Sequence, residues 1–297
     1  MATPSLVIIG NPAAGRGTAR RRAAALATSL ARHGLTVDGV VRWTTRQGDE
    51  ARLTQQAIDE GATLIGALGG DGTISQVGGT IAVAGANAVL LPLPAGTGND
   101  FVKSLAVPAH DHAAMLALAI DGSHRLIDVG QVDGVPFLNA AGFGFDADVV
   151  AATREVRWLS GAALYAGTAL RRLLGFRGVM AALNGTAPRR RVLAAFANGR
   201  VFGGAFHIAP DAELDDGALD AVLVDDASLV RRVSLLMSVA RGTHGTRAEV
   251  HSTRAAQFVL HLDGPAEYQA DGELRRTRTG IVSIDTMPAA LRVVARR

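Results

Sequence analysis

Three glycine-rich segments, each directly after a short apolar run, constrain the fold of this chain more than any other feature. They are Asn11–Gly17 after Leu6–Ile9, Gly69–Thr73 after Thr63–Leu68, and Pro94–Phe101 after Ala88–Leu93. Helical patterns separate the runs, and strand–helix–strand repetition favours a parallel sheet covered by helices on both faces. Because loops that follow parallel strands leave the sheet at one edge, we expect the three segments to converge there.

Apolar periodicity predicts the remaining elements of this first part. Strands are predicted at Leu6–Ile9, Val37–Trp43, Thr63–Leu68 and Ala88–Leu93, and helices at Thr18–His33, Asp49–Glu60, from about Thr73, and at His112–Ile120. Residues 73–99 carry no charge and are long enough to cross a bilayer. A lipid-exposed helix tolerates their glycines and prolines poorly, so they are predicted to form a buried helix, a turn and a buried strand.

The pattern changes after about residue 124, where turn residues separate short strand-like pieces. These lie at Leu126–Val132, Phe137–Ala140, Val192–Asn198, Phe206–Ala209, Ala218–Val224, Ala256–Leu262 and Gly280–Asp285. Two helical inserts, Arg154–Leu174 and Ser228–Arg241, interrupt them. Such a pattern predicts a second, β-rich domain of antiparallel type.

Composition excludes several classes of protein. Lys and Arg number 30 against 27 Asp and Glu, a net charge of +3, which is too balanced for a general nucleic-acid binder. The arginine clusters at 20–22, 171–172 and 189–191 are either solvated faces or contacts for anionic lipid headgroups. The absence of Cys rules out disulfides, thiolate nucleophiles and Cys-based metal sites, and it fits a reducing cytosol.

The segment Gly69-Gly70-Asp71-Gly72-Thr73 has the composition of a phosphate-binding turn. Glycines let the backbone approach a ligand closely, and the N-terminus of the following helix presents free N–H groups. The alternative is tight packing alone. Two other glycine patterns are not nucleotide motifs. Gly10–Gly17 lacks the Lys and Ser/Thr of a P-loop, and Gly142–Ala147 has no βαβ context for a dinucleotide.

Taken together, Asn11-Pro12 with Gly15, Gly69–Thr73 and Pro94–Phe101 resemble the three signature blocks of the diacylglycerol kinase catalytic-domain family. That family includes sphingosine and ceramide kinases, and the chain resembles its bacterial soluble lipid kinase branch over essentially its whole length. The resemblance implies an α/β N-terminal domain with a parallel sheet, of the NAD kinase and phosphofructokinase-like type, and a β-sandwich-like C-terminal domain. We expect the nucleotide-binding domain at 1–130, joined by the tail 287–297, the lipid domain at 131–286, and the active site in the cleft between them.

The resemblance also assigns candidate site residues. The nucleotide contacts would be Asn11, Pro12, Gly15, Thr44, Gly69, Gly70, Asp71, Gly72, Thr73, Gly96 and Thr97, with the neighbouring Thr45 as the alternative to Thr44. Glu273, in Asp271-Gly272-Glu273, matches the general base, and Asp71, Asp100 and Asp128 match a water-linked Mg²⁺ network. Taken alone, Asp271-Gly272 favours a tight hairpin turn.

A structural Mg²⁺ site is implied at Leu214–Asp220. There the Asp216 carboxylate and the carbonyl groups of Glu213 and Ala218 match the family's ligands. Oxygen donors of this kind suit a hard cation. Without the resemblance, the residues alone favour a surface turn with solvated carboxylates.

The resemblance therefore implies an enzyme that transfers phosphate from ATP, with Mg²⁺, to a hydroxyl group of a diacylglycerol-like or sphingoid lipid. We expect this enzyme in the cytoplasm, in peripheral contact with the inner face of the membrane. We expect no nucleic-acid partner, and the sequence leaves open whether the protein forms a homodimer. Arg154–Leu174 is either an interfacial helix or a helix packed on the β-rich domain. Two other functions stay open, an NAD kinase, which shares Gly69–Thr73, and a non-catalytic nucleotide- or lipid-binding protein with this fold.

Overall fold

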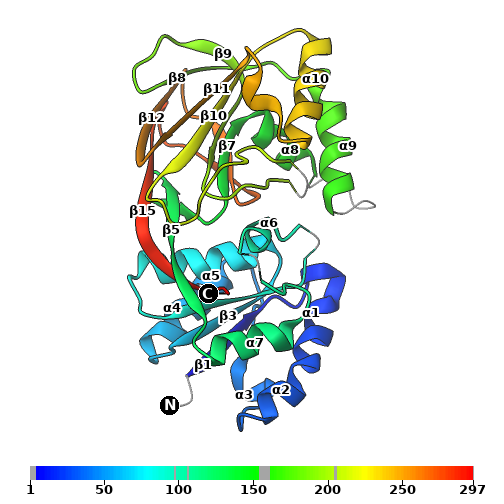
Figure 1. Cartoon of the computed structure of the whole chain (residues 1–297), viewed down its shortest axis with the longest axis vertical. Helices are drawn as coiled ribbons and strands as arrows, with labels where there is room; N and C mark the ends of the chain where they lie inside the picture. The colour runs from blue at the N-terminus through cyan, green and yellow to red at the C-terminus, as the bar shows by residue number, and fades with distance from the viewer. Residues whose placement is uncertain (1–4, 97, 106, 154–160, 204–205, 297) are drawn as a thin grey trace. The chain divides into compact units, whose positions relative to one another are not determined.

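The computed structural model describes residues 5–96, 98–105, 107–153, 161–203 and 206–296 (Figure 1). It divides into two compact units. Unit 1 comprises Met1–Ile127 and Ala289–Arg297, and unit 2 comprises Asp128–Pro288. The chain passes from unit 1 to unit 2 within β5 (His124–Val132) and returns within β15 (Ile281–Val294).

Unit 1 is built on a parallel sheet with the strand order β15-β4-β3-β1-β2. Its strands are β1 (Leu6–Gly10), β2 (Val41–Trp43), β3 (Leu64–Gly69), β4 (Val89–Pro94) and the last part of β15. Its helices are α1 (Ala14–Ala25), α2 (Ala27–Ala31), α3 (Val37–Val40), α4 (Asp49–Asp59), α5 (Asp71–Val83), α6 (Asp100–Lys103) and α7 (His112–Ile120). β1 and β3 are buried along their whole length, as continuous apolar runs in parallel sheets usually are.

Helices cover both faces of this sheet. α1 and α7 pack on one face, where Ala19 and Met115 join Ile8 and Leu93 in one apolar cluster. α4 and α5 pack against each other and against the sheet on the other face (Figure 1). This layering buries the sheet and leaves the loops at its carboxyl edge, where β1, β3 and β4 end.

The predicted strand Val37–Trp43 is wrong in its first half. Residues 37–40 form the short helix α3, because the Thr36 side chain accepts a hydrogen bond from Gly39 N–H (3.1 Å) and caps the turn. Only Val41–Trp43 pairs with β1. The predicted helix Thr18–His33 is divided between α1 and α2.

Unit 2 is an antiparallel β structure, and its described residues form three helices. Its strands are β6 (Val135–Phe137), β7 (Ala140–Gly144), β8 (Val179–Leu183), β9 (Arg189–Ala197), β10 (Leu219–Asp225), β11 (Val250–Ala255), β12 (Gln257–Leu262), β13 (Glu267–Ala270), β14 (Glu273–Arg276) and the first part of β15. Its helices are α8 (Phe145–Thr153), α9 (Gly161–Leu173) and α10 (Leu229–Ala240), with a 3₁₀ turn at His244–Thr246. β9 is central, since it pairs with β7, β8 and β10.

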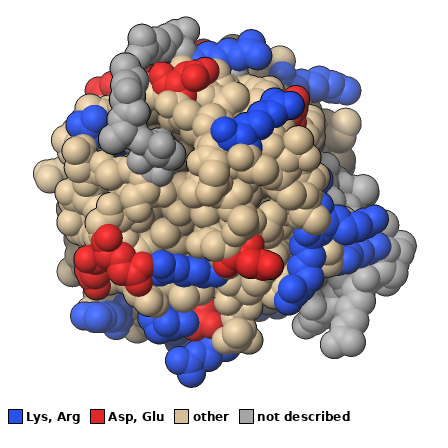
Figure 2. All heavy atoms as spheres, turned by 90° about the horizontal axis from the view of Figure 1, so that it is seen from below, with Lys and Arg blue, Asp and Glu red and all other residues tan. Residues whose placement is uncertain are grey.

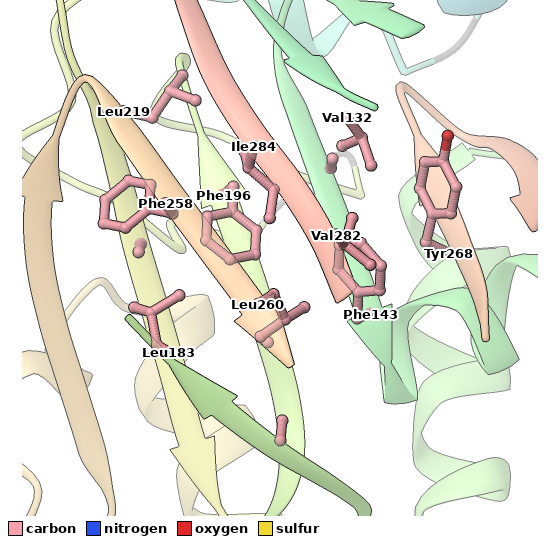
Figure 3. Packing of buried hydrophobic residues seen from close by; sticks show 14 of the residues in the cluster. Val132, Phe143, Leu183, Phe196, Leu219, Phe258, Leu260, Tyr268, Val282 and Ile284 are labelled. Atoms are coloured by element: carbon pink, nitrogen blue, oxygen red, sulfur yellow. The ribbon is translucent and has the colours of Figure 1, made fainter. Parts of the chain in front are cut away.

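Inward-facing aromatic and branched side chains form the core of unit 2. Phe143, Phe196 and Phe258 lie together with Leu260 and Ile284 between the strands, and each is at most 1% exposed (Figure 3). Phe143 also stacks on Tyr268, with ring centroids 5.2 Å apart. The alternation of such residues along facing strands is what a sandwich-like core requires.

The sequence prediction for unit 2 misses several elements. Residues 206–209 do not form the predicted strand; the segment contributes one bridge, Phe202 to Phe206, and is otherwise irregular. The short strands β8, β11, β13 and β14 and helix α8 were not predicted. Of the predicted insert Arg154–Leu174, residues 154–160 lie outside the described part, and α9 spans Gly161–Leu173.

Among the described residues, no helix is both long and apolar enough to cross a membrane. The face shown in Figure 2 carries interspersed basic and acidic side chains around an uncharged area. On that face, therefore, charge of one sign does not dominate.

Candidate functional site

The loops that follow β1, β3 and β4 meet, as the parallel order requires. Asn11 N–H donates to the Leu68 carbonyl oxygen (2.9 Å), and Ala95 N–H donates to the Gly69 carbonyl oxygen (2.6 Å). Gly15 has a positive φ of 58° and lies so close to Ala95 that an added Cβ would be 2.1 Å from its carbonyl oxygen. The three glycine-rich segments thus form one cluster at the carboxyl edge of the sheet.

Glycine is required in this cluster because backbones and buried side chains approach each other closely. A Cβ on Gly96 would lie 3.0 Å from the Gly70 Cα, and a Cβ on Gly69 would lie 2.4 Å from the Thr73 hydroxyl oxygen. Thr73 is buried in the first turn of α5. The N-terminus of α5 therefore opens at the glycine cluster, with backbone N–H groups available to an anion.

The Asp71 carboxylate joins two of the loops. Its two oxygens accept hydrogen bonds from the backbone N–H groups of Asn99 and Asp100, each at 2.8 Å. A Cβ on Gly98 would lie 2.7 Å from the same carboxylate. Asp100 in turn lies 2.9 Å from the Lys103 ammonium group. Asp71, which the family resemblance assigns to the nucleotide contacts and the Mg²⁺ network, thus also fixes the start of α6.

Asn11 has a partner that sequence reasoning missed. Its Oδ1 accepts a hydrogen bond from Ala13 N–H (3.0 Å), and its Nδ2 donates to Glu50 Oε1 (3.3 Å). Glu50 is only 5% exposed, in the first turn of α4. A carboxylate near a helix N-terminus is a common stabilising feature, so the sequence alone gave no reason to select it.

The neighbouring threonines 44 and 45 lie in different surroundings. Thr44 is buried, and its N–H donates to the Gly10 carbonyl oxygen (2.8 Å). The Thr45 hydroxyl and N–H both donate to Asp49, at 2.8 and 2.9 Å. The Thr45 bonds, followed by those from Arg52 and Arg46, hold the pKa of the Asp49 carboxyl well below its usual range. Thr97 lies outside the described residues.

In unit 2, Glu273 is placed by a tight hairpin. Ala270 pairs with Glu273, and Asp271 and Gly272 form the two-residue turn with φ of 48° and 82°. The Asp271 carboxylate accepts hydrogen bonds from three successive backbone N–H groups, those of residues 138–140, at 2.7, 2.9 and 3.0 Å. Asp271 and Gly272 therefore do form the tight hairpin turn that their sequence favours. This turn holds the half-buried Glu273 at the start of β14.

Hydrogen bonds connect the acidic loop at 213–220 to residues 138–140, the segment that binds the Asp271 carboxylate. Asp128 is 2% exposed; its carboxylate accepts from Gly217 N–H (2.6 Å), and its own N–H donates to the Leu214 carbonyl oxygen (2.6 Å). The fully buried Asn198 donates from Nδ2 to the carbonyl oxygens of both Asp128 and Leu138, each at 2.9 Å. One hydrogen-bond network therefore links the acidic loop to the segment that holds Asp271.

The donors proposed for a cation are of the right chemical type. Asp216 Oδ1 accepts from Ala218 N–H (3.1 Å), and Asp216 Oδ2 lies 3.2 Å from an Arg254 nitrogen. The described residues contain no cluster of three His or acidic side chains suited to a metal ion. A cation here would therefore depend on one carboxylate, on the carbonyl oxygens of Glu213 and Ala218, and on water, a donor set that fits Mg²⁺.

Unit 2 also contains an apolar pocket with a cavity volume of about 80 Å³. It lies between β9, β10 and the helices α8, α9 and α10, and its lining includes Leu173, Phe206, Leu235 and Val239. Asp146 and Arg232 are its charged wall residues. A lining of this kind suits a hydrocarbon chain better than a nucleotide.

Comparison with protein families gives two matches that cover nearly the whole chain. The model described as "Diacylglycerol kinase catalytic domain" matches residues 5–132. The model described as "YegS C-terminal NAD kinase beta sandwich-like domain" matches residues 139–295. The fold class predicted from the sequence, an α/β domain followed by a β-sandwich-like domain, is thereby confirmed.

Individual relatives agree with these matches. A protein of Mycobacterium tuberculosis named "Diacylglycerol kinase" is 30% identical over 97% of this chain and 94% of its own length. A Pseudomonas aeruginosa protein named "Probable lipid kinase YegS-like" is 33% identical over 85% of this chain and 83% of its own. A crystal structure titled as a diacylglycerol kinase from Bacillus anthracis has the same fold, with a TM-score of 0.73 at 21% identity, and the match covers 100% of this chain and 98% of that one.

Proposed function

The chain belongs to the diacylglycerol kinase family of lipid kinases, and from this premise we propose that it transfers the γ-phosphate of ATP to a hydroxyl group of a diacylglycerol-like or sphingoid lipid. The observation that carries the proposal is the glycine cluster of unit 1. Three loops there place backbone N–H groups and the N-terminus of α5 at one edge, which suits a triphosphate.

We assign the triphosphate to the loops that contain Gly15, Gly69–Thr73 and Gly96. Asn11, Pro12 and Thr44 border this cluster on the β1 and β2 side and are assigned to the nucleoside. Positioning of the phosphates against fixed N–H groups lowers the barrier without covalent chemistry by the protein.

Glu273 is assigned as the general base. The lipid hydroxyl oxygen attacks the γ-phosphorus, the bond between that phosphorus and the β–γ bridging oxygen breaks, and ADP leaves. Glu273 accepts the hydroxyl proton during the attack, so no positive charge builds up on the attacking oxygen. The anchored hairpin supports this role, because a base must be held within hydrogen-bond reach of the proton.

Glu213, Asp216 and Ala218 would hold a structural Mg²⁺ at the acidic loop. Asp71, Asp100 and Asp128 are assigned separately to a water-linked Mg²⁺ network. When bound, Mg²⁺ supplies positive charge that stabilises the phosphates during transfer. Asp128 fixes the loop through Gly217 N–H, so the Asp216 carboxylate and the two carbonyl groups keep one arrangement.

The apolar pocket is assigned to an acyl or sphingoid chain of the acceptor. Helices α9 and α10, which line it, also present exposed apolar side chains, namely Leu170, Val230 and Met237. A membrane lipid that leaves a bilayer needs such a path, and exposed apolar residues beside arginines suit a peripheral membrane contact.

The test is transfer of labelled γ-phosphate to a panel of acceptors in mixed micelles with Mg²⁺. The panel holds diacylglycerol, monoacylglycerol, sphingosine, ceramide and phosphatidylglycerol, with NAD as the control acceptor. Labelled lipid that is lost in the Glu273→Gln protein supports the proposal; turnover should fall by about 10²–10⁴-fold. Labelled NADP without labelled lipid would instead identify an NAD kinase, and nucleotide binding without any transfer would favour a binding protein.

A further inference from the structure

A buried glutamine beside the Glu273 hairpin makes hydrogen bonds through both the oxygen and the nitrogen of its side-chain amide. Gln269 has no exposed surface. Its Oε1 accepts a hydrogen bond from Gly272 N–H (2.7 Å), and its Nε2 donates to Asp146 Oδ2 (2.7 Å). A backbone N–H can only donate and a carboxylate can only accept, so the amide is satisfied in one orientation.

The glycine pattern at 142–147, which lacks the βαβ context of a dinucleotide motif, explains how the Asp146 carboxylate reaches Gln269. Asp146 is 2% exposed in the first turn of α8. A Cβ on Gly142 would lie 1.9 Å from Asp146 Oδ2, and a Cβ on Gly144, whose φ is 84°, would lie 2.7 Å from the Val192 carbonyl oxygen. Only glycine at 142 leaves room for the Asp146 carboxylate in this position.

Asp146 also contributes to the wall of the apolar pocket. One continuous path of contacts therefore runs from the pocket through Asp146 and Gln269 to Gly272, the residue directly before Glu273. The second support of the turn is the Asp271 carboxylate, which accepts hydrogen bonds from the backbone N–H groups of residues 138–140. The turn thus has two supports among the described residues, and the one through Gln269 leads by way of Asp146 to the pocket.

We propose that Gln269 and Asp146 are positioning residues that set the Glu273 carboxylate for proton transfer and couple its position to the chain held in the apolar pocket. The inference rests on the proposed lipid kinase activity. Neither residue is assigned contact with ATP. Loss of either contact should therefore lower kcat while the KM for ATP stays unchanged.

Exchanging the hydrogen-bond donor and acceptor between positions 269 and 146 provides a test. In Gln269→Glu, the side chain still accepts from Gly272 N–H but faces Asp146 with a second carboxylate. Adding Asp146→Asn restores a donor and an acceptor in reversed order, with the same net charge as the original pair. Gln269→Leu removes both hydrogen bonds, and Gln257→Glu, at an exposed position of β12 in the same unit, is the matched control.

We expect Gln269→Leu and Gln269→Glu to lower kcat by about 10–100-fold, since misplacing a reacting group by about 1 Å has effects of this size. The double variant should recover most of the kcat lost in Gln269→Glu, and the control should match the wild type. A structural role alone would lower the Tm and the yield of folded protein but not the kcat per folded molecule. The proposal is overturned if Gln269→Leu keeps its kcat within twofold, or if the double variant is no better than Gln269→Glu.

Failure of the underlying function is separable from failure of this inference. If the wild type phosphorylates no lipid, the proposed function fails and the kinetic comparison has no baseline. Hydrogen exchange at the Gly272 amide then tests the positioning directly. Faster exchange in Gln269→Leu than in the wild type supports the contact, and equal exchange in both overturns it.

Discussion

Replacing Asp271 by Asn tests whether the Glu273 hairpin is held in advance by its turn. The carboxylate accepts three backbone hydrogen bonds, at 2.7–3.0 Å, with two on Oδ1 and one on Oδ2. Asn keeps the shape but has one acceptor oxygen. One bond is therefore lost, an N–H group meets the new NH₂ group, and the other two bonds lose their charge assistance.

The expected cost follows from these contacts. A hydrogen bond to a charged group contributes about 1.5–3 kcal/mol, and a neutral one about 0.5–1.5 kcal/mol. Because Asp271 is partly exposed, the lower end applies, and the sum is about 3 kcal/mol. For a unit of this size that corresponds to a Tm about 6–12 °C lower.

Differential scanning calorimetry of Asp271→Asn measures this change, with Asp263→Asn as the control, since Asp263 is exposed. Turnover per folded molecule should fall as well, because Glu273 directly follows the turn. A Tm within 1 °C of wild type, together with full turnover, would refute the view that this carboxylate holds the hairpin.

Three further predictions address other parts of the chain. Asp71→Ala should abolish Mg²⁺-dependent turnover and lower the Tm, because it removes two hydrogen bonds of about 1.5–3 kcal/mol each between the glycine loops; full activity at an unchanged Tm would contradict both assignments. Ala169→Phe should fill the apolar pocket, raising the KM for long-chain lipids but not for ATP, and an unchanged KM for long-chain acceptors would remove the pocket from the acceptor site. Burial lowers the pKa of His112 and of His244 below the ordinary value of 6.5, so the unfolded chain binds more protons and stability is lost as the pH falls below about 6.5. Urea denaturation at pH 7.5 and 5.5 measures this loss, up to about 1.4 kcal/mol per pH unit for each His; an equal loss in His112→Gln/His244→Gln would assign it to other groups.

The parallel sheet and its loop cluster could be predicted because their signals are local. Thr63–Leu68 is an apolar run that ends at Gly69-Gly70, and the same arrangement recurs at Leu6–Ile9 and Ala88–Leu93. Parallel order then determines where the loops lie, without knowledge of any side-chain contact. Val37–Val40 was mispredicted because the Thr36 cap, a local side-chain contact, outweighs the β-propensity of valine.

The parts that could not be predicted depend on contacts between distant residues. Gln269 and Asp146 are 123 positions apart, and Asp271 reaches backbone groups more than 130 positions away. The pairing of Arg292 in β15 with Val89 in β4 likewise joins distant residues, and the return of the tail to the first domain was expected from the family resemblance alone. Sequence periodicity does not predict such pairings. Asp271 could therefore be predicted as a turn residue, but not as the residue that binds the backbone of residues 138–140.

The central claim is that the glycine cluster and Glu273 serve one phosphoryl transfer from ATP to a lipid hydroxyl. Its most direct test is the stoichiometry of ADP and phosphorylated lipid when the wild-type protein acts on ATP, Mg²⁺ and diacylglycerol or sphingosine in mixed micelles. The account predicts one ADP for each lipid phosphomonoester formed, with little free phosphate. ADP formed with free phosphate but no phosphorylated lipid would contradict it.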